Sequence, residues 1–249
     1  MKKKVKILLA FMLMLGGFMM FVYPIITDTL YKRGVSIKEK EYEENISKII
    51  NGDYDDNFND IDNGNGIINE KVNNRLPDLL NMLKDRNNKI FEEKQKTFLD
   101  KKMYDISDIN LANYGLTNNI FGFIEIPSIN VTLPIYLGAS NSNMRKGAVH
   151  LTGTSYPIGG VNTNSVLAAH RGYYKTKMFR NIDSIKLGDK LYIKNFDGIL
   201  TYKAVDITII KPDELDKLLI NEGKDMVTII SCHPYPQNKE RYVVYFERV

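Results

Sequence analysis

The stretch Thr228–Arg241, TIISCHPYPQNKER, is the most informative part of the sequence. The β-branched run Val227–Ser231 predicts a strand that ends at Cys232. The eight residues that follow, HPYPQNKE, are typical of a loop. Arg241 then begins another apolar run, so we expect the next strand to return beside the first and bring Arg241 close to Cys232.

Similar short apolar runs, separated by turn residues, extend outward from this stretch to Ile120. Candidate strands cover residues 121–126, 131–136, 165–170, 190–194, 200–210, 226–231 and 241–247. About seven strands with few helices between them indicate a mainly β fold, a closed or nearly closed β-barrel.

Composition excludes several classes of protein. The chain has 249 residues, one cysteine and 43% apolar residues, which excludes a disulfide framework, a zinc site built on paired cysteines and a wholly disordered chain. The net charge of +4 comes from four lysines within residues 1–27. The remaining chain carries 30 basic and 30 acidic residues, so we expect no nucleic-acid partner.

Residues 1–27 predict an N-terminal membrane anchor. Ile7–Thr27 carries no charge, and about 20 such residues span a hydrocarbon core of roughly 30 Å. Bulky Phe21, Val22 and Tyr23 stand where a signal peptide would be cleaved, which favours an uncleaved anchor over a cleaved signal or a buried soluble helix. The lysine cluster before the span favours a cytoplasmic N-terminus, although basic residues also follow it. We therefore expect a single-pass protein of the cell membrane with an extracytoplasmic C-terminal domain.

Residues 28–117 predict a polar, partly helical spacer or cap. A helix near residues 36–50 would end at Asn51-Gly52, and residues 68–104 indicate one or two further helices, with an apolar stripe of Ile90, Phe91, Phe98, Leu99 and Met103. The acidic stretch 53–66 resembles a calcium loop, but its register fails because Ile61 would occupy the first ligand position. A solvated loop is the better interpretation.

Cys232 at a strand end is a candidate nucleophile, since a thiol becomes reactive when a base stands beside it. Three histidines could supply that base. His233 follows Cys232 directly and would point to the opposite face of an extended strand. His170 ends another apolar run, and His150 lies in a loop-like stretch. Arg241 could stabilise an oxyanion. Any of these residues alone could equally be structural, and Cys232 could be buried and inert.

The sequence around Cys232 resembles that of the sortases, in which a strand ending in T-L-x-T-C is followed by a loop and an arginine. The nine-residue interval from Cys232 to Arg241 and the C-x-P-Y start of the loop resemble class C sortases. The family's histidine segment is similar to LAAHRG, and FGFIEIPSINVTLPIYLGAS, GAVHLTGTSYPIGG and IKLGDKLYI resemble class C barrel segments in the same order. The resemblance covers about residues 118–249.

The resemblance implies a sortase-like eight-stranded β-barrel over 118–249, with Cys232, His170 and Arg241 as catalytic residues and no metal or cofactor. It implies a cysteine transpeptidase that cleaves an LPxTG-like sorting signal between Thr and Gly through a thioester. The acyl group would pass to an amine partner, a pilin lysine in pilus assembly on Gram-positive bacteria, or a peptidoglycan cross-bridge in the anchoring of surface proteins.

Departures from class C leave alternatives open. Ser231 and His233 replace the usual threonines, and residues 28–117 contain no Asp-Pro-aromatic lid motif. One alternative is a cysteine peptidase or an L,D-transpeptidase, but the latter's S-H-G-C-x-R pattern places its histidine before the cysteine. Another is an anchored, non-catalytic β-barrel that binds a wall or pilin protein.

Overall fold

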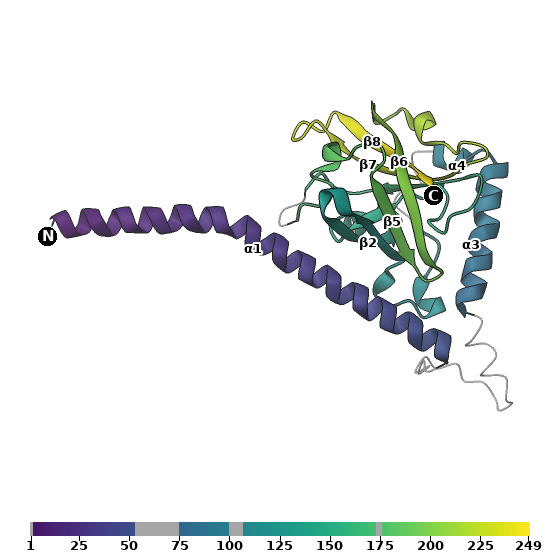
Figure 1. Ribbon diagram of the computed structural model, residues 1–249, viewed down its shortest axis with the longest axis horizontal. Coiled ribbons are helices and arrows are strands. Elements are labelled where there is room, and N and C mark those ends of the chain that lie inside the picture. Colours follow the sequence, from purple (N-terminus) through teal and green to yellow (C-terminus); the bar gives the residue numbers. More distant parts are fainter. Residues whose placement is uncertain (1, 53–74, 100–106, 173–175) are drawn as a thin grey trace.

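The computed structural model describes residues 2–52, 75–99, 107–172 and 176–249, a long helix followed by two shorter ones and a barrel (Figure 1). The helices are α1 (Lys2–Asn51), α3 (Arg75–Glu92), α4 (Lys96–Leu99) and α5 (Asn141–Met144), and the short 3-10 helices are η1 (Leu111–Tyr114), η2 (Thr117–Asn119), η3 (Pro127–Ile129), η4 (Ile182–Ser184) and η5 (Leu215–Leu218). The strands are β1 (Gly122–Ile126), β2 (Val131–Leu137), β3 (Ala148–His150), β4 (Thr163–Ala168), β5 (Lys190–Asn195), β6 (Gly198–Ile210), β7 (Asp225–His233) and β8 (Glu240–Arg248).

The eight strands form a closed barrel in the order β1-β2-β3-β4-β7-β8-β6-β5, which confirms the predicted fold. Most neighbours are antiparallel, but β2–β3 and β4–β7 are parallel. Because β4 and β7 run in the same direction, their C-terminal ends meet at the same rim of the barrel.

Alternate residues of β4, β7 and β8 belong to two apolar clusters, as the two-residue period of a strand requires. One cluster fills the barrel and includes Leu167, Val227, Ile229, Val244 and Phe246. The other packs Val166, Ile230 and Val243 against Phe98 of α4 and Leu218 of η5, which lie outside the barrel. Each fully buried side chain of this size contributes about 1.5–3 kcal/mol. The outer face of these three strands is therefore apolar and covered.

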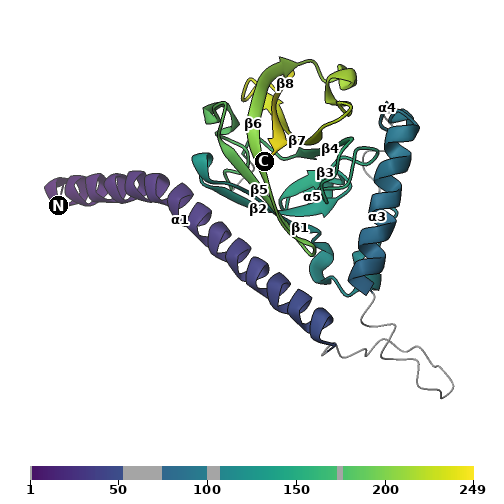
Figure 2. The ribbon, with the colours of Figure 1, turned by 45° about the vertical axis from the view of Figure 1, so that its right-hand side comes forward.

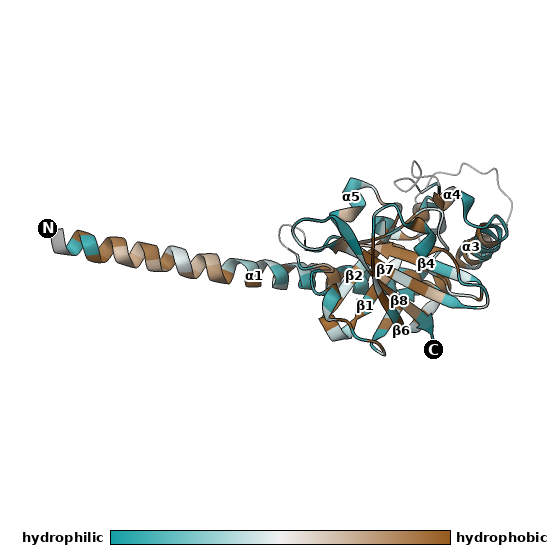
Figure 3. Ribbon diagram, turned by 90° about the horizontal axis from the view of Figure 1, so that it is seen from above, coloured by the Kyte–Doolittle hydropathy of each residue, from teal (hydrophilic) through white to brown (hydrophobic). Residues whose placement is uncertain are grey.

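Helix α1 is continuous from Lys2 to Asn51, where the prediction had an anchor and a separate short helix. Its N-terminal half exposes apolar side chains to the surroundings (Figure 3) and is long and apolar enough to cross a membrane. Its C-terminal half buries Val35, Tyr42 and Ile49, whose seven-residue spacing defines one face. The Tyr42 hydroxyl donates a 2.6 Å hydrogen bond to the Phe121 carbonyl. One continuous helix thus contains the exposed apolar segment in its N-terminal half and docks on the barrel with its C-terminal half.

Helix α3 lies on a different side of the barrel from α1 (Figure 2) and buries Leu76, Leu79 and Leu83. Of the predicted stripe, Ile90 is half-buried and packs against the core, and Phe91 is half-buried. Of its other members, Phe98 is buried and Leu99 is exposed. Met103 and the acidic loop 53–66 lie outside the described residues.

The short strand β3 was missed because it is three residues long in a stretch rich in turn residues. It places His150 in the interior, stacked on Tyr156 at 4.9 Å between ring centroids. Nε2 of His150 lies 3.1 Å from the carbonyl oxygens of Thr154 and Ser155, to which an Nε2–H donates. Burial lowers the pKa of His150 to about 4, against an ordinary value of 6.5. His150 is thus a buried, neutral histidine.

This lowered pKa predicts a loss of stability in mild acid. Below pH 6.5 the unfolded chain takes up a proton at His150, whereas the folded chain does so only near pH 4. The contribution of His150 is therefore complete above pH 6.5 and falls by up to about 3 kcal/mol as the pH drops to 4. Urea denaturation of the full chain in detergent at pH 7 and pH 4.5, compared with His150→Gln, measures it. Equal pH dependence in both proteins would contradict the assignment.

Candidate active site

The C-terminal ends of β4 and β7 and the start of β8 bring two of the predicted site residues into register. Cys232 and Arg241 are direct partners in the antiparallel β7–β8 pair. Residues paired in this way have their Cα atoms about 4.5–5.5 Å apart and project to the same face. Both side chains are half-buried. The loop between the strands, residues 234–239, therefore returns the arginine to the cysteine as the sequence predicted.

His170 reaches the same level from β4. The parallel register pairs Ala168 with Ile230, and the Ala169 N–H donates to the Ile230 carbonyl at 3.3 Å. His170 and Cys232 each lie two residues beyond this pair, so the register brings their backbones to the same level at the rim of the barrel. Burial lowers the pKa of His170, and the nearby positive charge of Arg145 lowers it further. The imidazole is therefore mainly neutral at neutral pH and able to accept a proton.

The opposite face of the same strand ends holds a separate cluster around Arg171. Nη1 of Arg171 lies 2.7 Å from Nδ1 of His233 and 3.4 Å from the Cys232 carbonyl oxygen, and Nη2 forms an ion pair with Asp183. The Ser231 hydroxyl donates to the Ala169 carbonyl at 2.8 Å. These bonds connect the ends of β4 and β7 beyond the last pair of the ladder. They hold the chain segments that carry His170 and Cys232.

The three histidines thus have different surroundings. His233 points away from Cys232 to Arg171, as strand alternation predicted, and lies 5.6 Å from the Tyr242 ring. His150 lies in the interior. His170 is the one whose segment the β4–β7 register brings to the level of Cys232.

Arg241 contacts the loop that it follows. Its Nη1 donates to the carbonyls of Asn238 at 3.1 Å and Glu240 at 2.9 Å. A guanidinium has five N–H donors, so these bonds leave donors for a substrate oxygen beside Cys232. Cys232 and Arg241 therefore project to one face of the barrel, and the segment that carries His170 follows β4 at the same rim.

The apolar cluster on this face is continuous with the site. Ile230 and Val243 lie two residues from Cys232 and Arg241 on the same side of their strands, and Phe98 of α4 covers them. Gly153, at φ +89°, allows this approach, because an added Cβ would stand 2.8 Å from the Phe98 nitrogen. The segment before the barrel therefore contributes a side chain next to the candidate residues.

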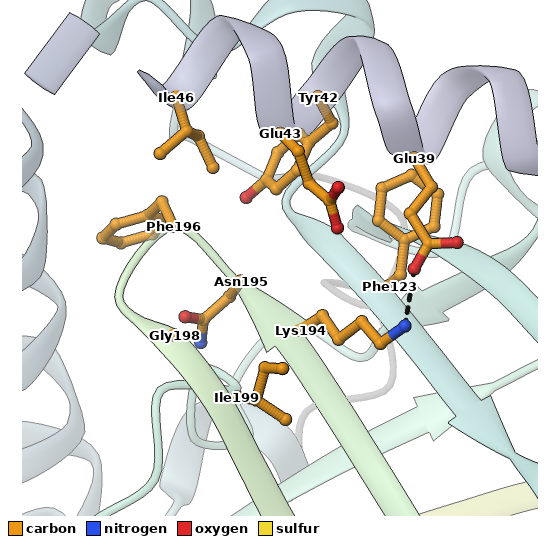
Figure 4. Close-up of a pocket in the computed structure, with 10 residues that line it drawn as sticks. All are labelled: Glu39, Tyr42, Glu43, Ile46, Phe123, Lys194, Asn195, Phe196, Gly198 and Ile199. Atoms are coloured by element: carbon orange, nitrogen blue, oxygen red, sulfur yellow. Dashed lines mark hydrogen bonds and ion pairs between the residues drawn. The ribbon is translucent and has the colours of Figure 1, made fainter. Parts of the chain in front are cut away.

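A pocket of about 240 Å³ lies elsewhere, between α1 and β5 (Figure 4). Lys194 at its edge bonds Glu39 at 2.8 Å and Glu125 at 2.9 Å, which ties α1 to the barrel. Its lining includes neither Cys232 nor His170 nor Arg241. This pocket belongs to the docking of α1.

Comparisons with known proteins identify the family of this chain. The sortase domain model matches residues 124–249. The chain belongs to the sortase family. Sortase A of Bacillus anthracis is 30% identical over 156 residues, 62% of this chain and 72% of that protein. Sortase D of Bacillus subtilis (strain 168) is 29% identical over 136 residues, 53% of this chain and 66% of that protein.

Several solved structures similar to this sortase are class C members. Sortase C1 of GBS pilus island 1 has a TM-score of 0.68 at 28% identity, covering 86% of this chain and 98% of that one. Sortase C-1 of Streptococcus pneumoniae has a TM-score of 0.56 at 32% identity, covering 68% of this chain and 90% of that one. Sortases are cysteine transpeptidases, and the predicted resemblance to class C is confirmed.

Sequence reasoning missed the Arg171 cluster. The sequence did contain one sign of this cluster, since Arg171 directly follows His170. Neighbouring residues at a strand end face opposite sides, so Arg171 could be expected on the face away from His170. Its partner Asp183 lies twelve residues further on and could be connected to it only through the structure.

Replacing Arg171 by alanine tests its connection between β4 and β7. The substitution leaves Asp183 and His233 without this partner, so we expect the free energy of unfolding to fall by about 1–3 kcal/mol. The matched control is Arg86→Ala, which removes a more exposed ion pair with Asp108 and is expected to cost at most about 1 kcal/mol. Urea denaturation measures both. An equal or smaller loss for Arg171→Ala would show that the cluster does not hold the strand ends.

Proposed function

We propose that the chain is a membrane-anchored sortase in which Cys232 is the nucleophile, His170 the general acid and base, and Arg241 the oxyanion stabiliser. The observation that supports this assignment best is the strand register, which pairs Cys232 with Arg241 and carries His170 to the same level. In this reading residues 1–27 are the anchor, 28–117 a spacer or cap, and 118–249 the catalytic barrel.

The first half of the reaction forms a thioester. Neutral His170 takes the thiol proton, and the Cys232 sulfur attacks the carbonyl carbon of threonine in an LPxTG-like signal. Arg241 donates to the oxyanion of the tetrahedral intermediate. The Thr–Gly C–N bond then breaks, and His170 gives its proton to the departing glycine amine.

The second half transfers the acyl group to an amine. The acceptor nitrogen attacks the thioester carbonyl, and His170 takes its proton. The C–S bond then breaks to release the Cys232 thiolate, to which His170 returns the proton. We propose a pilin lysine as the acceptor, because similar solved structures are titled as pilus-island class C sortases. A peptidoglycan cross-bridge amine is the alternative acceptor.

Anchoring is proposed from α1. Its apolar segment is exposed and long enough to cross a membrane, and four lysines precede it. With the N-terminus on the cytoplasmic side, the single span leaves the barrel outside the cell.

The assignment of Cys232 is tested by mass spectrometry of the full chain in detergent, mixed with an LPxTG peptide and either a pilin-type lysine peptide or oligoglycine. We expect a covalent acyl adduct that depends on Cys232, is absent in Cys232→Ala, and moves to the lysine peptide. Transfer to oligoglycine alone would favour wall anchoring. The absence of an adduct in a protein whose Cys232 still reacts with an alkylator would contradict the proposed substrate, and the absence of both would favour the non-catalytic barrel.

Arg241→Ala tests the oxyanion role. By analogy with the loss of an oxyanion-hole donor, we expect the acylation step to lose about 3 kcal/mol of transition-state stabilisation, roughly a hundredfold in rate. Arg241→Lys keeps the charge but loses the planar fork and should recover only part of the rate. Single-turnover acylation measures both variants, with Arg86→Ala as the control. An Arg241→Ala protein as fast as the parent would refute the role.

A further inference from the structure

The point where α1 leaves its apolar segment lies beside the catalytic end of the barrel. The uncharged run ends at Thr27. Asp28 then lies 3.5 Å from Nζ of Lys177, and the Tyr31 hydroxyl donates to the Lys146 carbonyl at 3.0 Å. At 1.5 Å rise per residue, Tyr31 is only about 6 Å along the helix from Thr27. The barrel therefore begins to contact α1 almost directly after the apolar segment.

Both contacts are made by segments that belong to the catalytic end. Lys177 lies in the segment after His170, and the Phe179 N–H donates back to the His170 carbonyl at 3.1 Å. Lys146 follows Arg145, whose charge acts on His170. In Figure 1 the yellow turn between β7 and β8 projects in the direction in which the N-terminal half of α1 extends. The turn between β5 and β6 lies far along α1, near Glu39 and Glu43.

Exposed basic side chains gather at this end. We call them the basic collar: Lys32, Arg33, Arg145, Lys146, Lys177 and Arg180. Asp28 pairs with Lys32 and Lys177 of the collar, and Asp183 pairs with Arg171 outside it, so the collar has more basic than acidic side chains. The net charge of α1 also changes with distance from the apolar segment, from +2 over residues 28–38 to −2 over residues 39–51. Positive charge therefore lies close to the apolar segment and negative charge away from it.

We propose that the basic collar binds the anionic phospholipid headgroups of the membrane that holds α1, so that the catalytic end of the barrel faces the bilayer surface. The proposal rests on the membrane anchoring proposed above. Lysine and arginine side chains near an anionic surface are attracted to it within about a Debye length. Pro24 interrupts the hydrogen bonds of α1 just before the docked half. A helix can bend at a proline, so attraction to headgroups can change the orientation of the barrel relative to the apolar segment.

This orientation would set the distance between Cys232 and the lipid headgroups. A substrate segment that reaches Cys232 would have to be presented within a short distance of the lipid headgroups, under a positively charged rim. Acidic side chains in that segment would be drawn to the same end.

The absence of tryptophan from the chain provides a direct test. Single tryptophans are introduced into the full chain by Tyr235→Trp in the β7–β8 turn, Ile199→Trp at the opposite end, and Phe18→Trp in the apolar segment; all three side chains are exposed. Each protein is placed in nanodiscs with either zwitterionic or phosphatidylglycerol-containing lipid. Quenching by nitroxides is measured, with the nitroxide on the headgroup for positions 235 and 199 and on the acyl chain for position 18.

We expect headgroup quenching at position 235 to exceed that at 199 at least twofold in anionic discs and to decrease in zwitterionic discs. The double substitution Lys146→Gln and Lys177→Gln should lower headgroup quenching at position 235 in anionic discs toward its value in zwitterionic discs. Lys84→Gln with Lys89→Gln on α3, an equal change of charge, should leave it unchanged.

The failures are distinguishable. An unquenched tryptophan at position 18 would overturn the anchoring proposal and this inference with it. Quenching at 18 with equal quenching at 235 and 199 would overturn the orientation alone. Quenching at 235 that does not respond to lipid charge or to the collar substitutions would overturn headgroup binding and leave an acidic protein partner as the better occupant of the collar.

Discussion

The parallel pairing of β4 with β7 is the constraint on which the rest of the site depends. Parallel strands end at the same rim, so the residues that follow Ala168 and Ile230 stand side by side. The antiparallel return of β8 adds Arg241 opposite Cys232. The segments that carry His170, Cys232 and Arg241 are up to 71 positions apart in the sequence and thus meet at one rim of the barrel. A shift of one residue in either register would turn one of these side chains to the opposite face.

The surrounding structure stabilises this meeting point from both faces of the strands. On one face, Ile230 and Val243 are buried under Phe98 and Leu218, so the ends of β7 and β8 continue from a packed apolar surface. On the other face, Arg171 and Ser231 connect the chains where the ladder stops. The docked half of α1 then holds this end of the barrel close to the end of the apolar segment through Tyr31 and Asp28.

The sequence predicted the strands well where β-branched runs are bounded by turn residues, as in Val227–Ser231, and it predicted that Cys232 and Arg241 would be neighbours. It missed β3, because three residues carry too little periodicity. The continuity of α1 was missed because the change from apolar to acidic side chains looks like a boundary, although a helix backbone continues across it. The Arg171–Asp183 pair depends on tertiary proximity that no local pattern contains.

We infer that His170 and Cys232 act on one another at the end of the parallel pair. The rate of alkylation of Cys232 by iodoacetamide as a function of pH tests this, in the full chain and in His170→Ala, with His150→Gln as the control for a histidine elsewhere. We expect His170→Ala to change both the rate at neutral pH and the shape of the profile, whereas His150→Gln, at pH values where it remains folded, should change neither. Identical profiles for the parent and His170→Ala, matching a free thiol, would show that the two residues do not interact.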